Sequence, residues 1–187
     1  MIKHAFNAKK SAQAASILLR LNGGDMQKYC LIKMLYLADR KAFARWGEPI
    51  TGDHAVSMQH GPVLSGIYNL TKGELPHLRV HWEPFISDAD PETHQVASKE
   101  NPGTDELSPA EITILQGIYA EFKDFTWKQM RDYCHDFEEY DPTVGTGSRP
   151  ITTEAILRAV GKSDPEIAEA DEEMKEYKMM QAVLGAR

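Results

Sequence analysis

Cysteine is scarce in this chain, with Cys30 and Cys134 in 187 residues and no CxxC pair. Two cysteines inside helical patterns supply neither a disulfide framework nor a sulfur-rich zinc site, so we expect two buried thiols. No apolar run is long enough to span a membrane, and the first residues lack the apolar region and cleavage site of a signal peptide. We therefore expect a cytoplasmic protein without a membrane partner.

Positive charge is also in short supply. Lys and Arg number 21 against 28 Asp and Glu, which gives a net charge of -7. Sequence-independent binding to nucleic acid depends on Lys and Arg neutralising phosphates, so this balance disfavours a nucleic-acid partner. Acidic residues are concentrated between Asp164 and Glu176, where Lys175 is the one basic residue. This asymmetry fits a basic partner, although a solvated helix face explains it equally well.

The remaining composition is that of an ordinary globular protein, at 42% hydrophobic and 26% charged residues. A chain of this length buries roughly two thirds of its unfolded surface, enough for one core. No repeat, low-complexity tract or long linker divides it before about residue 162. We therefore expect one domain over residues 1–162 and an acidic C-terminal helix over residues 163–187, which could serve as a partner-binding extension.

Helix signals dominate the chain. Asn7 can cap a helix over 8–21, and Asp25 is the expected cap of a long amphipathic helix that ends at Trp46-Gly47. Capping boxes at Ser108–Glu111 and Thr126–Gln129 predict two further helices. Others should begin at Thr152 or Thr153 and at Ser163.

Strand signals are fewer. His54–Gln59 reads as a short strand, and Gly61-Pro62 should then turn the chain into a helix over about 63–72. Alternation of Leu78, Val80 and Trp82 with polar residues predicts a half-buried strand, with which 93–100 could pair as a hairpin. Residues 140–150 read as a loop. The predicted fold class is mainly α (α+β): a compact helical domain with a small antiparallel sheet or hairpin, plus a C-terminal helical extension.

Asp39 lies at the apolar boundary of the long helix, between Tyr36 and Phe43. An unpaired carboxylate there would cost several kcal/mol, so we expect it to find an Arg, a His or backbone N–H groups near the Gly52 or Gly61 turns. A structural role, fixing a loop against the helix, is the first interpretation.

Asp53 and His60 bracket the expected strand, and an acid near an imidazole is the minimum for general acid–base chemistry. A small hydrolase built on these two residues, with His135 as a third member, is one hypothesis. The chain has no nucleophile elbow, phosphate loop or HExxH motif to support it. A zinc trio of His77, His81 and His94 is a further, less favoured possibility.

The segments KMLYLADRKAF, ITGD and SMQHGPVLSGIYNL together resemble the core signature of the SocA-like, Panacea antitoxin family. LSPAEITILQGIYAEF is similar to a later helix of that family, and YCHDFEEYDPTVGTGSRPI to its closing segment. The resemblance spans about 25–151. It departs at Ala55, where an aromatic residue is frequent in the family, and at Tyr140, where tryptophan is usual.

The resemblance implies a non-catalytic antitoxin, without cofactor or metal, that binds and neutralises a protein toxin encoded by an adjacent gene. It also implies a ClpXP-type protease as a second partner, since a SocA-like member delivers its toxin to such a protease. A winged-helix-like transcriptional regulator is the alternative from another class, although a basic recognition helix is missing. The residues expected to form the motif core or contact the toxin are Tyr36, Asp39, Arg40, Asp53, His60, Gly61, Pro62, Val63, Tyr68 and His135.

Overall fold

The computed structural model describes residue 2 and residues 4–184. The helices are α1 (Ala8–Leu21), α2 (Lys28–Trp46), α3 (Ser65–Leu70), α4 (Pro76–Arg79), α5 (Pro109–Phe122), α6 (Trp127–His135), the 3₁₀ turn η1 (Pro142–Val144), α7 (Thr153–Ala159) and α8 (Asp164–Leu184). The strands are β1 (Asp25–Gln27), β2 (Ala55–Met58), β3 (Gly61–Leu64), β4 (Gln95–Ala97) and β5 (Ser148–Pro150). The predicted class, mainly helical with a small antiparallel sheet and a C-terminal helix, is confirmed.

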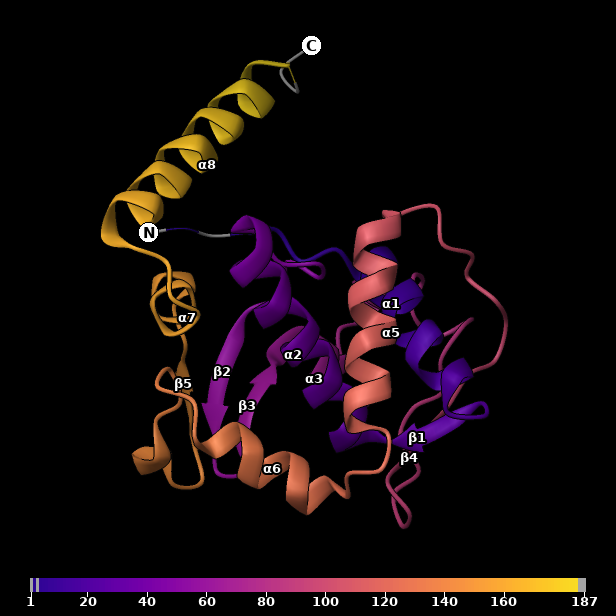
Figure 1. The fold of residues 1–187 in the computed structure, drawn as a ribbon. Helices are drawn as coiled ribbons and strands as arrows, with labels where there is room; N and C mark the ends of the chain where they lie inside the picture. Colours follow the sequence, from indigo (N-terminus) through magenta and orange to yellow (C-terminus); the bar gives the residue numbers. More distant parts are fainter. Residues whose placement is uncertain (1, 3, 185–187) are drawn as a thin grey trace.

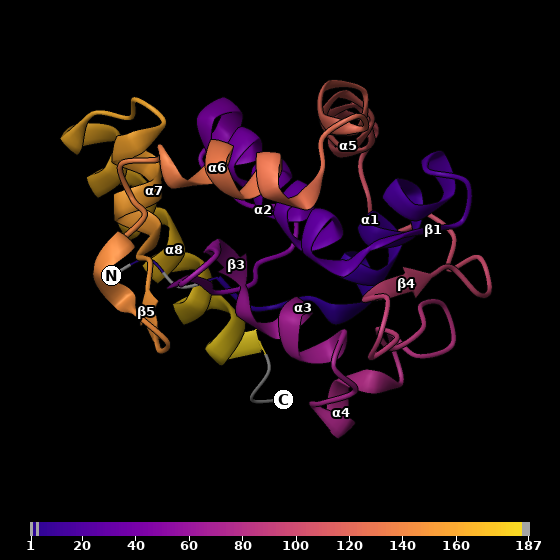
Figure 2. The ribbon, with the colours of Figure 1, turned by 90° about the horizontal axis from the view of Figure 1, so that it is seen from below.

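The long helix α2 lies at the centre of the molecule. Helices α1, α5, α6 and α7 and strand β3 all pack against it. Figure 1 shows α5 running beside α1 and α2, and Figure 2 shows α6 crossing α2 on the same side. Because α2 is surrounded, its apolar residues are buried around most of the helix, and Leu31, Ile32 and Leu35 are fully buried.

Two small antiparallel sheets flank this helical core. In the larger one β2 lies between β3 and β5, with Ala55 opposite Leu64 and Val56 opposite Pro150. In the smaller one β1 pairs with β4, and Met26 lies opposite Val96. The predicted strand at 54–59 is thus confirmed, in the centre of the larger sheet.

The start of α2 differs from the prediction, whereas its end does not. Asp25 begins β1 and the side chain of Gln27 caps the helix, accepting a hydrogen bond from the Tyr29 amide. Pairing with β4 holds the residues before Lys28 extended, so the helix begins three residues after the expected cap. Gly47 ends it in the left-handed conformation, at φ 83°, as predicted.

The predicted strand over residues 78–82 is wrong. This segment forms α4 and successive turns, in which the amides of Leu78 and His81 donate to carbonyls three residues earlier. Val80 is 67% exposed while Trp82 is buried, so the alternating residues do not share one face. The expected hairpin does not form over 78–82, because 95–97 pairs with β1. Residues 97–100 instead contact the later residues 84–87, through the Ile86–Ser98 bridge and through hydrogen bonds such as the one from the Lys99 amide to the Phe85 carbonyl.

Two smaller corrections concern the segments beside β2. Val63 and Leu64 belong to β3, so the following helix begins at Ser65. The loop expected over 140–150 contains η1 and β5, which pairs with the free edge of β2. Neither strand shows an apolar and polar alternation, because all of β3 is buried and all of β5 is exposed.

The C-terminal helix α8 follows α7 and projects from the rest of the molecule (Figure 1). Ile167 is buried near its start, and Ala170 and Met174 pack partly against the core. Farther along, Met179 and Met180 are exposed at 71% and 58%. Across the described residues, no helix combines the length and apolar character needed to cross a membrane.

Candidate functional site

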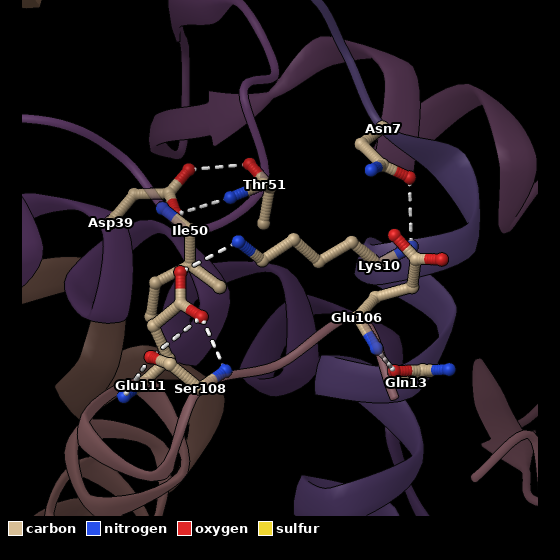
Figure 3. Close-up of polar contacts among 9 residues, drawn as sticks. All are labelled: Asn7, Lys10, Gln13, Asp39, Ile50, Thr51, Glu106, Ser108 and Glu111. Carbon is tan, nitrogen blue, oxygen red and sulfur yellow. Dashed lines mark hydrogen bonds and ion pairs between the residues drawn. The ribbon is translucent and has the colours of Figure 1, made fainter. Parts of the chain in front are cut away.

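Asp39 finds its partners in the loop after α2. Its carboxylate accepts hydrogen bonds from the amides of Ile50 and Thr51, both at 2.9 Å, and from the Thr51 hydroxyl at 2.5 Å (Figure 3). Burial raises the pKa of Asp39 to about 7, against the opposing effect of these hydrogen bonds. The prediction of backbone N–H partners near the Gly52 turn agrees with this geometry, which ties the 50–51 loop to the helix.

A second polar network, on the other side of this loop, joins α1 to α5 (Figure 3). The Lys10 ammonium lies 2.7 Å from a Glu111 carboxylate oxygen. The other oxygen of Glu111 accepts from the amide and hydroxyl of Ser108, completing the predicted capping box. Glu111 therefore both starts α5 and fixes it against α1.

The Asp53 carboxylate accepts hydrogen bonds from backbone amides. The donors are the amides of His54 at 2.7 Å, Gly66 at 3.0 Å and Ile67 at 2.8 Å. Two of these amides belong to the first turn of α3, so Asp53 caps that helix from across the sheet. Burial raises the pKa of this carboxyl, while the three hydrogen bonds oppose the shift.

Tyr36 and Arg40 meet at a carboxylate that the sequence did not indicate. The Tyr36 hydroxyl and the Arg40 Nε both donate to Oε1 of Glu139, at 2.8 Å. The Glu139 side chain is completely buried, and the Arg40 guanidinium lies 4.0 Å from the centre of the Phe137 ring. This cluster fastens the segment after α6 to the middle of α2.

The expected site residues divide between two cavities that share no lining residue. Tyr36, Asp39, Arg40 and Asp53 line a cavity of about 30 Å³, room for about one water molecule. His60, Gly61, Val63 and Tyr68 line another, of about 130 Å³. The structure therefore does not bring the Asp53 carboxylate and the His60 imidazole together, as the hydrolase hypothesis requires.

The larger cavity lies between α2, α6 and the turn that joins β2 to β3. Tyr29 and Trp127 form an aromatic wall, with ring centres 6.0 Å apart, and the exposed His60 ring meets Trp127 edge-on at 5.9 Å. Gly61 adopts φ 96°, a conformation that side chains rarely take.

Two further expected residues lie beside this cavity. The Pro62 carbonyl accepts a hydrogen bond of 3.4 Å from Lys33 Nζ. His135 stacks on Tyr140, with ring centres 4.6 Å apart, and its Cδ2 and Nε2 lie near Gly61. The Tyr140 hydroxyl in turn donates to the Met58 carbonyl, so the residue that replaces the usual tryptophan has a definite contact.

Lys33 is the most unusual lining residue, and sequence reasoning missed it. Its side chain is 2% exposed, and burial lowers the pKa of its ammonium group. The sequence contains a signal for this burial, because the residues one turn before and after Lys33 on the helix are Tyr29, Cys30, Tyr36 and Leu37. Lys33 therefore lies on an apolar helix face, as Asp39 does.

The histidines considered for zinc do not converge. His94 lies against Tyr29, with ring centres 5.8 Å apart, whereas His77 and His81 belong to α4 and its following turn. Within residues 2 and 4–184 no group of three ligating side chains has the geometry to hold a metal ion. Cys30 and Cys134 are free buried thiols, as expected, and burial raises the pKa of each to about 11.

Comparison with protein families gives one informative match. The family model described as "Antitoxin SocA-like, Panacea domain" matches residues 31–140. That range begins in α2 and ends at Tyr140, so it contains every residue of the expected motif core, from Tyr36 to His135. Comparison with curated proteins gives no match, and comparison with solved structures gives none. With more than half of its length matched, this chain belongs to the SocA-like antitoxin family defined by the Panacea domain.

Proposed function

We propose that this protein is the antitoxin of a toxin–antitoxin pair and neutralises its cognate protein toxin by direct binding in the cytoplasm. Membership of the SocA-like family is the observation that carries the proposal. The polar groups of the motif core are consistent with it, because Asp39, Asp53 and Arg40 hold loops and helices in place. Their role in the proposal is to give the binding surface a fixed shape.

The surface around α8 is our choice for the toxin contact. A groove of about 910 Å³ lies between α8, the residues that follow α2 and the N-terminal segment. Trp46 is 37% exposed at this groove, and Ala170 and Met174 line it from α8. Aromatic and methionine side chains are frequent where proteins bind partners of variable shape.

The charge of this surface suggests the chemistry of the partner. Glu169 and Glu173 line the space beside Trp46 and Lys162. Acidic residues continue along α8, so a toxin segment that combines basic and apolar side chains would match both its charge and its exposed methionines. A division of labour follows, in which residues 1–162 form the shared domain and α8 supplies specificity.

Co-expression with the product of the adjacent gene tests the proposal. The expected result is restored growth and a complex that copurifies in stable proportions. The double variant Glu169→Lys/Glu173→Lys should weaken the complex, because it reverses the charge at the groove. Glu121→Lys, on an exposed position of α5, is the matched control. If no neighbouring gene product forms a complex with the protein and growth is not restored with any of them, inhibition by binding is ruled out.

The same experiment separates occlusion from delivery to a protease. If the protein only occludes the toxin, toxin levels stay constant while activity falls. If it also acts as an adaptor for a ClpXP-type protease, toxin levels fall in cells that contain the protease and recover in cells that lack it.

A further inference from the structure

The cavity of about 130 Å³ is lined by an amine, Lys33 Nζ, that forms no ion pair with the residues that the structure describes. Lys33 Nζ can donate three hydrogen bonds, and the one it makes within the described part of the chain is the 3.4 Å contact to the Pro62 carbonyl. Among the described residues, the groups that shift the pKa of Lys33 through their charge are Cys134, Cys30 and Arg131, and none of these is a carboxylate. An ammonium group buried to this extent is normally paired with an acid.

Gly61 allows Lys33 and His135 to pack closely against the backbone at the edge of the cavity. A Cβ on this residue would lie 2.7 Å from Lys33 Nζ and 3.2 Å from His135 Cδ2, so a larger side chain would fit only if these groups moved. His135 Nε2 is also buried and makes no hydrogen bond to any described residue. Two polar groups with unused hydrogen-bonding capacity thus meet at a residue that lines the cavity.

The rest of the cavity favours a flat apolar group. Tyr29, Trp127 and Tyr68 contribute rings, and Ile32, Met58 and Val63 contribute aliphatic surface. Lys33 is buried and His60 is exposed, so the cavity leads from a cationic group in the interior to an aromatic rim at the surface. Its size suits a single small ring system, well below the 300 Å³ or more of a pocket for a drug-sized ligand.

We propose that this cavity binds a small carboxylic acid with a planar apolar group. The carboxylate pairs with Lys33 Nζ, while the planar group packs against Tyr29 and Trp127, all three of which line the cavity. One cationic side chain matches a monoanion, and the net charge of -7 opposes a polyanion. The proposal goes beyond toxin neutralisation and does not depend on it.

The test uses the isolated full-length protein with phenylacetate, benzoate and indole-3-acetate as probes, followed by NMR of the Gly61 amide and the Trp127 indole. We expect saturable shifts at millimolar concentrations or below. Phenylacetamide, the neutral match of phenylacetate, should bind about tenfold more weakly or worse, because it cannot form the charge-assisted pair.

Lys33→Met removes the amine and retains an apolar side chain of similar length, and it should reduce phenylacetate affinity by about tenfold or more. Lys41→Met, at an exposed position of the same helix, should leave affinity unchanged. Equal binding of acid and amide by the wild-type protein would overturn the proposal, and so would the absence of saturable shifts with all three acids. A short peptide with a free C-terminal phenylalanine, compared with its amidated form, shows whether a chain terminus can supply the same group.

Discussion

At the scale of single residues, the two most deeply buried charged groups of α2, Lys33 and Asp39, have opposite surroundings. Asp39 accepts three hydrogen bonds from Ile50 and Thr51, so its oxygens are satisfied. Within the part of the chain that the structure describes, Lys33 has one long hydrogen bond and no carboxylate partner. Satisfied buried groups are a normal part of a folded structure, whereas an unsatisfied one requires a separate explanation. For this reason we assign Asp39 to architecture and Lys33 to ligand binding.

Two replacements of Asp39 should distinguish the contribution of its hydrogen bonds to stability from the contribution of its charge. Asp39→Asn retains an oxygen acceptor for the two amides, so its free energy of unfolding should stay within about 1 kcal/mol of wild type at pH 7. Asp39→Ala leaves both amides buried without an acceptor and should lose roughly 3 kcal/mol. Urea denaturation measures both values. Equal losses in the two variants would contradict this assignment.

The raised pKa of Asp39 also predicts a pH dependence. The folded protein binds this proton more tightly than the unfolded chain, so the contribution of Asp39 to stability is largest near pH 4 and declines as the pH rises to about 7. Relative to Asp39→Asn, the wild type should lose up to about 4 kcal/mol across this range. Asp124→Asn, on the exposed turn after α5, is the control and should leave the wild-type pH profile unchanged.

Lys33→Met should increase stability, by about 1 kcal/mol or more at pH 7, because it removes the cost of burying an amine. The pKa of Lys33 is lowered in the folded protein, so the unfolded chain binds the proton more tightly and wild-type stability rises with pH through the interval below the usual lysine value. The variant should lack this rise. Chemical denaturation between pH 7 and 10 measures it, and a large destabilisation at pH 7 would show that Lys33 supports the fold.

At the scale of elements, local capping signals determine where α5 begins. The Ser108 hydroxyl accepts from the Glu111 amide, and the Glu111 carboxylate accepts from the Ser108 amide while also pairing with Lys10. Ser108→Ala should therefore cost about 1 kcal/mol in thermal or urea unfolding. Thr113→Ala, at an exposed position inside the same helix, should change stability little. A similar loss in both variants would mean that the cap contributes nothing.

The elements that differed from prediction are those whose form depends on a distant partner. β1 is extended because it pairs with β4, about 70 residues later in the chain. β5 pairs with β2, and nothing in its own Ser148–Pro150 sequence indicates a strand. At 78–82 the alternation was real in the sequence, but successive turns place Trp82 inside and Val80 outside. The hydrophobic periodicity of one segment contains no information about such pairings with distant segments.

At the scale of the whole molecule, α8 differs from the other long helices because it projects from the domain and exposes Met179 and Met180 (Figure 1). Amide hydrogen exchange should therefore be fast around Met179 and Met180 and slow around Leu31 and Leu35 in α2. If α8 contacts the toxin, as we propose, exchange in its outer half should slow in the complex while α2 changes little. Unchanged exchange in α8 would place the toxin contact elsewhere.

The candidate site was recovered in part from the sequence. The need of Asp39 for backbone donors followed from its position on an apolar helix face, and the left-handed conformation of Gly61 followed from residue type. The predicted change from strand to helix at Gly61-Pro62 was wrong, because both residues belong to β3. The sequence did not indicate that Glu139 is the partner of Tyr36 and Arg40, because it lies about 100 residues away in a stretch that contains several acidic residues. The sequence also did not indicate that Asp53 and His60 line two different cavities.

The sequence by itself determined the helical class, the capped starts of α1, α5 and α6 and, through its motifs, the antitoxin family, because caps, glycine stops and apolar stripes act over a few neighbouring residues. Only the tertiary structure decided which strands pair, which carboxylate Arg40 binds and that Lys33 is buried beside an open cavity. Those outcomes depend on contacts between residues far apart in the chain, whose energies have no counterpart in any single segment.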